Sequence, residues 1–384
     1  MNTRTVALGT CLALLLSLSA CSFPLQSEEE SSAPALVSPD FQEQEPSASG
    51  TDFLQEIVLD ESGFQHFDLE RELTLSVSCS GEIAGTLRGS IYTLCAQKLS
   101  EWTDGKLKLR LYDGGVLGNN QELIEAMQSG TVDLMMSDQG GFLSTIPEMS
   151  ILSIHGLYHS LEECNEALEE FAPMLQPYFQ QQGLRLLCLY TDAFNIITSN
   201  QRLEGPEDLR GLNIRGWIDG YDREFWQALD CNPLPMPLSD VYLNMQQGKI
   251  NASILFWSGI FDNHLYDLQK YVLSTTYFPS FSVVSMSNQT WEALSQPERE
   301  VVTQMFRYKM ELETACCTIL SQRYQKLVRE KDMTVITQMS PEFSAALDEA
   351  SAAMTEVLRQ YIDSSLVDQY LALTESGSSR LLSG

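Results

Sequence analysis

Beyond an acidic N-terminal stretch, hydrophobic residues alternate between the two-residue period of a β-strand and the spacing of a helix. Strand patterns cover 73–77 and 107–111, with a helical pattern over 91–102 between them. A second helical pattern ends at Gly130, and a third strand pattern follows over 132–136. Strands and helices in this alternation predict parallel strands joined by right-handed crossovers, so we expect an α/β fold.

An echo of this pattern indicates a second α/β lobe. Residues 127–133 (MQSGTVD) and 245–251 (MQQGKIN) both have the pattern of a helix end, a glycine stop and the start of a strand. Further strands are predicted over 184–190, 212–215 and 250–255. Such junctions are common enough for a chance match, but we interpret the echo as a second lobe that is built like the first.

A long helix is predicted near the C-terminus because neither glycine nor proline occurs between Glu298 and Lys331. At ~1.5 Å per residue it would reach ~50 Å, enough to bridge two lobes. The expected organisation is a signal sequence over 1–21, an acidic flexible linker over 22–72, a first lobe over 73–192 plus 281–320, and a second lobe over 193–280 plus 321–374.

The N-terminal 21 residues have the pattern of an export signal. Arg4 precedes a short apolar run that ends in Leu18-Ser19-Ala20-Cys21, which resembles the motif at which bacterial lipoproteins are cleaved and lipidated on cysteine. An ordinary secretory signal with a chance cysteine is the alternative. Residues 22–72 carry 13 acidic residues against one basic residue, which is typical of a self-repelling spacer. We therefore expect an extracytoplasmic body, lipid-anchored through Cys21 to the outer face of the cell membrane or its periplasmic side.

The net charge of −29 excludes nucleic acid as a plausible partner, because phosphates repel such a surface. Enzyme signatures such as GxSxG, HExxH, Walker A and GxGxxG are absent from the sequence, as is a CxxC pair. His155 and His159 have the spacing of metal ligands on a helix, but no third ligand is evident. We expect neither catalysis nor a metal nor a cofactor.

Arg215 is the first candidate binding residue. It ends an apolar strand in a chain that is poor in positive charge, and its planar guanidinium suits a carboxylate. An internal salt bridge to one of the many acidic residues is the alternative. Ligands in open α/β sheets bind beyond the carboxyl ends of the strands, where Ser78, Asn120 and Asp138 fall. Aromatic residues near such ends could wall a pocket or belong to the core, namely Trp217, Phe256 and Trp257.

Several motifs together are similar to the extracytoplasmic solute receptors of tripartite ATP-independent periplasmic (TRAP) transporters. They are ITSN (197–200), GPEDLRGLNIR (205–215), NPLPMPLSDVY (232–242), QG (247–248), LYDLQKY (265–271) and WEALS (291–295), with weaker matches at GKL (105–107), LG (117–118) and GTVDL (130–134).

The resemblance covers roughly 73–370 and implies a type II periplasmic-binding-protein-like fold, in which two α/β lobes close on a ligand and a long helix spans them. It also implies a small organic acid as ligand, Arg215 as the carboxylate clamp, and the membrane permease subunits of an ion-coupled transporter as partners. Ser78, Asn120 and Asp138 match cleft positions of the first lobe.

Departures from the family pattern affect the expected ligand. A second basic residue of the family falls on Asn195, and Ile254 and Leu255 replace a common Glu and Asn. We therefore expect one cation and a more apolar pocket, suited to a monocarboxylate with an apolar or aromatic body; a neutral ligand or a degenerate receptor is the alternative. The alternative functions are a solute-binding lipoprotein of an ATP-driven importer, a surface-anchored hydrolase and a structural envelope lipoprotein.

Overall fold

The computed structural model describes residues 54, 57, 59, 61–81, 86–216 and 222–381, with side chains to residue 374. All of them belong to the unit Ser38–Gly384. The predicted signal sequence with Cys21, the predicted linker up to residue 53 and Trp217 lie outside the described residues.

The first lobe is built on a five-stranded sheet of order β2-β1-β3-β10-β4. Strand β1, which lies between β2 and β3, is parallel to both of them, as the alternating sequence pattern predicts. Strand β10 returns from later in the chain and is antiparallel to β3 and β4. The bounds are β1 Leu73–Ser78, β2 Leu107–Tyr112, β3 Leu134–Asp138, β4 Leu184–Phe194 and β10 Pro279–Ser287.

Helices of the first lobe begin at polar capping residues that the sequence supplies. The Thr86 and Ser160 hydroxyls accept N–H groups of the first turns of α1 and α3, and Asn119 forms a capping box with Glu122 at α2. The bounds are α1 Leu87–Trp102, α2 Asn120–Gln128, α3 Leu161–Gln181 and α7 Asn288–Ala293.

The second lobe is built on a six-stranded sheet of order β11-β9-β5-β8-β6-β7. The strands are β5 Ile196–Ser199, β6 Asn213–Gly216, β7 Asn232–Pro235, β8 Ala252–Leu255, β9 Tyr271–Leu273 and β11 Thr334–Ile336. The α-helices of this part of the fold are α4 Asp222–Ala228, α5 Val241–Gln246, α6 Trp257–Asp262 and α9 Pro341–Leu358.

The internal echo in the sequence is a structural repeat. Helices α2 and α5 both end at a glycine with positive φ, +74° at Gly130 and +70° at Gly248. After each glycine, the next N–H donates to a carbonyl five residues back, at 2.8 Å after α2 and 2.9 Å after α5. This is the Schellman arrangement that a glycine permits. A strand that is parallel to an earlier neighbour follows in each lobe, β3 beside β1 and β8 beside β6.

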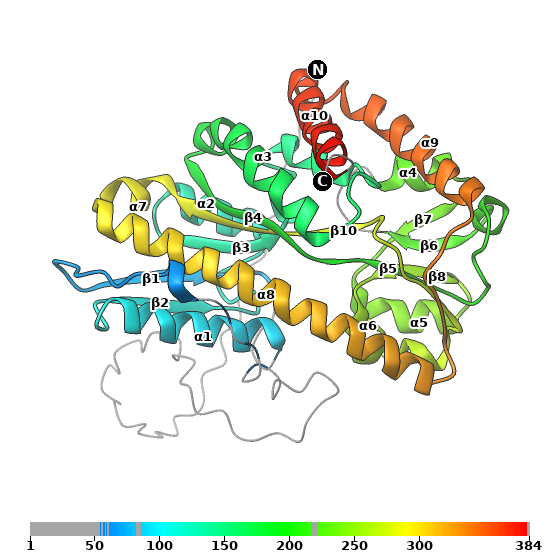
Figure 1. Cartoon of the computed structure of the whole chain (residues 1–384), viewed down its shortest axis with the longest axis horizontal. Helices are drawn as coiled ribbons and strands as arrows, with labels where there is room; N and C mark the ends of the chain where they lie inside the picture. The colour runs from blue at the N-terminus through cyan, green and yellow to red at the C-terminus, as the bar shows by residue number, and fades with distance from the viewer. Residues whose placement is uncertain are drawn as a thin grey trace, which may run out of the picture. The chain divides into compact units, whose positions relative to one another are not determined.

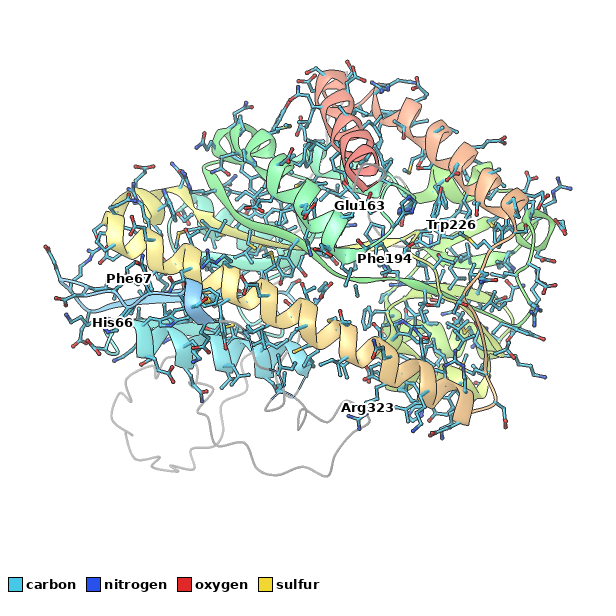
Figure 2. All side chains as sticks on the ribbon, in the orientation of Figure 1. His66, Phe67, Glu163, Phe194, Trp226 and Arg323 are labelled. Atoms are coloured by element: carbon cyan, nitrogen blue, oxygen red, sulfur yellow. The ribbon has the colours of Figure 1, made fainter. Side chains whose placement is uncertain are left out.

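The chain crosses between the sheets at two neighbouring points. Strand β4 runs through Asn195 directly into β5, and the chain returns from β9 into β10 through Phe278. The Asn195 N–H donates to the Phe278 carbonyl at 2.7 Å, so the two crossings are tied together. Figure 2 labels Phe194 at the end of β4, where this strand leaves the first sheet.

Helix α8 (Gln296–Glu330) crosses both lobes, as the sequence predicts (Figure 1). It packs on α1 and β4 in the first lobe and on α6 and β11 in the second. An additional helix, α10 (Ser364–Leu381), was not predicted and packs on α3. Its Tyr370 ring contacts Phe171 of α3 and Tyr158 just before that helix. The predicted limits of the two lobes stay a prediction.

Candidate functional site

Arg215 lies in β6 at the carboxyl ends of three adjacent strands. The parallel ladders place it opposite Leu234 of β7 and Ser253 of β8. Its guanidinium donates from Nε to the Met236 carbonyl at 3.1 Å and from Nη1 to the Ile254 carbonyl at 3.0 Å. These two hydrogen bonds fix the orientation of the guanidinium, and the residue is only 4% exposed.

The charge of Arg215 is retained despite its burial. Burial lowers the pKa of Arg215 to about 10, and the negative charge of Asp222 opposes this shift. The side chain is therefore still cationic at neutral pH. A cation held this way, away from bulk water, is suited to binding a carboxylate through charge-assisted hydrogen bonds.

Arg215 forms part of the wall of a cavity of about 260 Å³. Asn120 at the start of α2, Asp138 at the end of β3 and Asn195 at the crossing between the sheets line the same cavity. The structure thus brings together four of the residues that the sequence analysis selected. The other lining residues are Gln139, Gly140, Gly141, Leu143, Ser153, His155, Asp222, Ile254, Phe278, Pro279 and Ser280.

Two of these four residues also organise the first-lobe loops. The Asn120 side-chain oxygen accepts the Ser80 hydroxyl at 2.6 Å, which joins the loops after β1 and β2. Asp138 Oδ1 accepts the Gly141 N–H at 3.1 Å and begins the short 3₁₀ helix after β3. Asn120 and Asp138 therefore hold the loops at this cavity in place as well as lining it.

Asn195 presents an acceptor without a partner. The residue is 5% exposed, and its backbone N–H is used by the Phe278 carbonyl. Its side-chain oxygen makes no hydrogen bond with any described residue. A buried acceptor in a cavity wall is costly to leave unsatisfied, which favours a ligand or water that donates to it.

His155 and Asp222 are site residues that the sequence analysis did not select. His155 Nε2 lies 3.3 Å from Asp222 Oδ1, and both side chains are more than nine-tenths buried. The His155 ring packs edge-on against Phe225 and Phe278. Behind it, Phe278 stacks on Trp226, which Figure 2 labels beneath α9. The cavity is therefore more polar than expected and has an aromatic back wall.

The comparison with known proteins identifies the family. The family model for "Bacterial extracellular solute-binding protein, family 7" matches residues 85–363. This chain belongs to that family. The sequence prediction of a TRAP-type solute-binding protein is confirmed, and so is the two-lobe α/β fold.

Curated relatives of this family-7 protein include two with named ligands. The 2,3-diketo-L-gulonate-binding periplasmic protein YiaO of Escherichia coli is 26% identical over 199 residues, covering 51% of this chain and 61% of that protein. The sialic acid-binding periplasmic protein SiaP of Vibrio cholerae is 24% identical over 243 residues, covering 60% of this chain and 76% of that protein. Among solved structures, a TRAP periplasmic solute-binding protein from Ochrobactrum anthropi superposes with a TM-score of 0.75 at 21% identity, covering 81% of this chain and 97% of that one.

A second cavity of about 210 Å³ in the family-7 protein shares Asn120 and Asp138 with the first. Its wall contains four of the five members of a group that we call the buried charge cluster and define as Arg88, Tyr190, Asp192, Lys309 and Glu313; Asp192 lies outside the wall. All members are buried except Arg88, whose side chain is 53% exposed. Lys309 Nζ lies 2.5 Å from both the Tyr190 hydroxyl and Glu313 Oε2. Arg88 contacts Glu313 at 3.3 Å and Asp192 at 3.4 Å. The cluster joins α1, β4 and α8 beneath the cleft loops.

Three other selected residues do not line the first cavity. Ser78 is fully buried, and its hydroxyl donates to the Tyr112 carbonyl at 3.2 Å within the first sheet. Trp257 packs into the hydrophobic core, and Phe256, which precedes α6, is 41% exposed. The aromatic surface of the cavity comes from Phe278 instead.

The described residues contain no group of three or more His, Cys, Asp or Glu side chains placed to hold a metal ion. Among them, too, no helix is both long and apolar enough to cross a membrane.

Proposed function

We propose that this family-7 protein is an extracytoplasmic receptor of a TRAP transporter. It captures a small organic acid between its two lobes, with Arg215 as the carboxylate clamp, and delivers it to an ion-coupled membrane permease. The observation that carries the proposal is one buried, charged guanidinium, fixed by backbone carbonyls, in the wall of a cavity that residues of both lobes line.

The named ligands of the relatives support a carboxylate. YiaO is named for 2,3-diketo-L-gulonate and SiaP for sialic acid, and both compounds are carboxylic acids. The cavity volume of about 260 Å³ is just below the ~300–1,000 Å³ found for ligand pockets. The ligand is therefore a small metabolite rather than an oligomer.

Capture by closure follows from the two crossings between the sheets. Asn195 and Phe278 lie at these crossings and line the cavity, so a rotation there changes the space around the ligand. A ligand that contacts both lobes binds the closed form better and shifts the equilibrium toward it. Closure excludes water, which strengthens the contact between Arg215 and the carboxylate.

We further propose that Cys21 carries the lipid anchor and that the acidic segment after it is the tether. The receptor then stays at the outer face of the cell membrane, or its periplasmic side, beside its permease. Its task is reversible binding, so it needs neither a catalytic residue nor a cofactor.

The clamp is tested by thermal unfolding of the purified chain against a panel of sugar acids and other organic acids. A ligand at 100 times its Kd stabilises the native state by about 2.7 kcal/mol, which raises Tm. Arg215→Ala is expected to abolish that rise. Arg210→Ala, which removes an arginine whose side chain is 72% exposed in the same lobe, is the matched control and should keep it. An equal rise in Tm for wild type and Arg215→Ala would refute the clamp.

A further inference from the structure

The first cavity offers a ligand both signs of charge. Arg215 is the only lysine or arginine among the described residues that line it, whereas Asp138 and Asp222 both contribute carboxylates. Asp222 is 7% exposed, and its charge is close enough to act on the Arg215 guanidinium. A ligand that enters this space meets a buried anion as well as the cation.

The cavity also contains buried groups that need hydrogen-bond partners. The Asn195 side-chain oxygen can only accept, and it has no partner among the described residues. Both ring nitrogens of His155 also lack a hydrogen bond within the described part, although Nε2 lies 3.3 Å from Asp222 Oδ1. A ligand that carries only a carboxylate supplies acceptors and leaves the Asn195 oxygen unsatisfied.

Electrostatics decides between the candidate ligands. A carboxylate bound at Arg215 adds a second negative charge to a closed, water-poor space that already holds Asp222, and like charges repel strongly there. A hydroxyl on the ligand would satisfy Asn195 but would add no positive charge beside Asp222, whose neighbour His155 compensates it only when protonated. A protonated amine would do both, because an ammonium group donates to Asn195 and offsets the charge of Asp222.

We propose that the cleft selects a small zwitterionic ligand, such as an amino acid, with its carboxylate on Arg215 and its ammonium group toward Asp222 and Asn195. The inference rests on the proposed receptor function and narrows its ligand class from organic acids to amino-bearing acids.

The first test compares ligands on one carbon skeleton with the wild-type chain. Isothermal titration calorimetry measures Kd for butyrate, 2-hydroxybutyrate, 2-aminobutyrate and 4-aminobutyrate, and for the corresponding six-carbon series. An amino member is expected to bind at least tenfold more tightly than the parent acid and the hydroxy acid, since it adds a charge-assisted hydrogen bond. Equal or tighter binding of a parent or hydroxy acid would overturn the proposal.

The second test asks whether Asp222 provides the selection. Asp222→Asn keeps the shape of the side chain and removes its charge, so the preference for the amino acid over the hydroxy acid should fall at least tenfold. Asp230→Asn, at a 74% exposed side chain, is the control and should leave the preference unchanged. If Asp222 served only structure, the substitution would weaken both ligands by the same factor, and that result would remove its proposed role.

The two proposals fail separately. If organic acids bind without any preference for an amine, and Arg215→Ala abolishes their binding, the receptor stands and the zwitterionic ligand is wrong. If no acid of either series binds, amino or otherwise, the ligand class is wrong, and a broader acid panel that still depends on Arg215 decides the receptor function.

Discussion

The buried charge cluster gives a prediction about stability that can be worked out from the structure. Glu313 is 1% exposed and is surrounded by Lys309, Arg88 and the Tyr190 hydroxyl. Burial opposes its ionisation, yet the two cations hold the pKa of Glu313 at about 2, below its ordinary value of 4.5. Replacing Lys309 with Met removes the closer cation and keeps a chain of similar length.

The expected loss is about 3 kcal/mol at pH 7. That is the lower end of the ~3–5 kcal/mol typical of removing one partner of a buried ion pair, because Arg88 and the Tyr190 hydroxyl still stabilise the Glu313 carboxylate. A carboxyl group whose pKa is lower in the folded state than in the unfolded state stabilises the folded protein at pH values above the unfolded-state pKa. This stabilisation is lost as the pH falls from about 4.5 toward 2. The difference between wild type and Lys309→Met should therefore shrink with falling pH over that range.

Urea unfolding at pH 7 and at pH 3.5 measures both effects. Lys326→Met, at an exposed lysine on the same helix, is the matched control and should cost less than 1 kcal/mol at either pH. The reasoning would be refuted if Lys309→Met cost no more than Lys326→Met at pH 7, or if its cost did not depend on pH.

Two further predictions concern glycines and the anchor. Gly156→Ala should destabilise the protein by about 2–5 kcal/mol, because φ is +78° and a Cβ would lie 2.5 Å from the Tyr277 ring. Gly248→Ala has a similar φ of +70° but open space around a Cβ, so it should cost only about 1–2 kcal/mol. Equal losses in urea unfolding would contradict the packing argument. Cys21→Ser should abolish incorporation of radiolabelled fatty acid into the chain and release it from the membrane fraction, and continued labelling of the variant would show that Cys21 is not the acceptor.

The sequence was sufficient for the parts of the fold that depend on local order. Alternating periods predicted the parallel strands β1, β2 and β3, and the absence of glycine and proline predicted α8. Topology, which places cleft residues at strand ends, selected Asn120 and Asp138, and the family resemblance added Asn195. Arg215 followed from its position at the end of an apolar strand.

The remaining site residues depend on contacts between distant segments, which no local pattern contains. His155 meets Asp222 and Phe278 only because the chain crosses between the sheets beside them. In the sequence, His155 stood out only through its spacing from His159, and no motif marked Asp222. Trp257 was misleading because an aromatic residue after a strand fits a core as well as a pocket, and here the core contains it.

Asn195 connects the two lobes through its backbone and also lines the first cavity. Its backbone N–H joins the two crossings between the sheets by bonding to the Phe278 carbonyl, and its side-chain oxygen has no partner among the described residues. A substitution at this position therefore changes the cavity wall and one of the crossings between the sheets together. In the proposed receptor, a substitution at Asn195 that changes solute preference would therefore also change the crossing at which the lobes are proposed to rotate, whereas Arg215 lies within a sheet and is separate from that crossing.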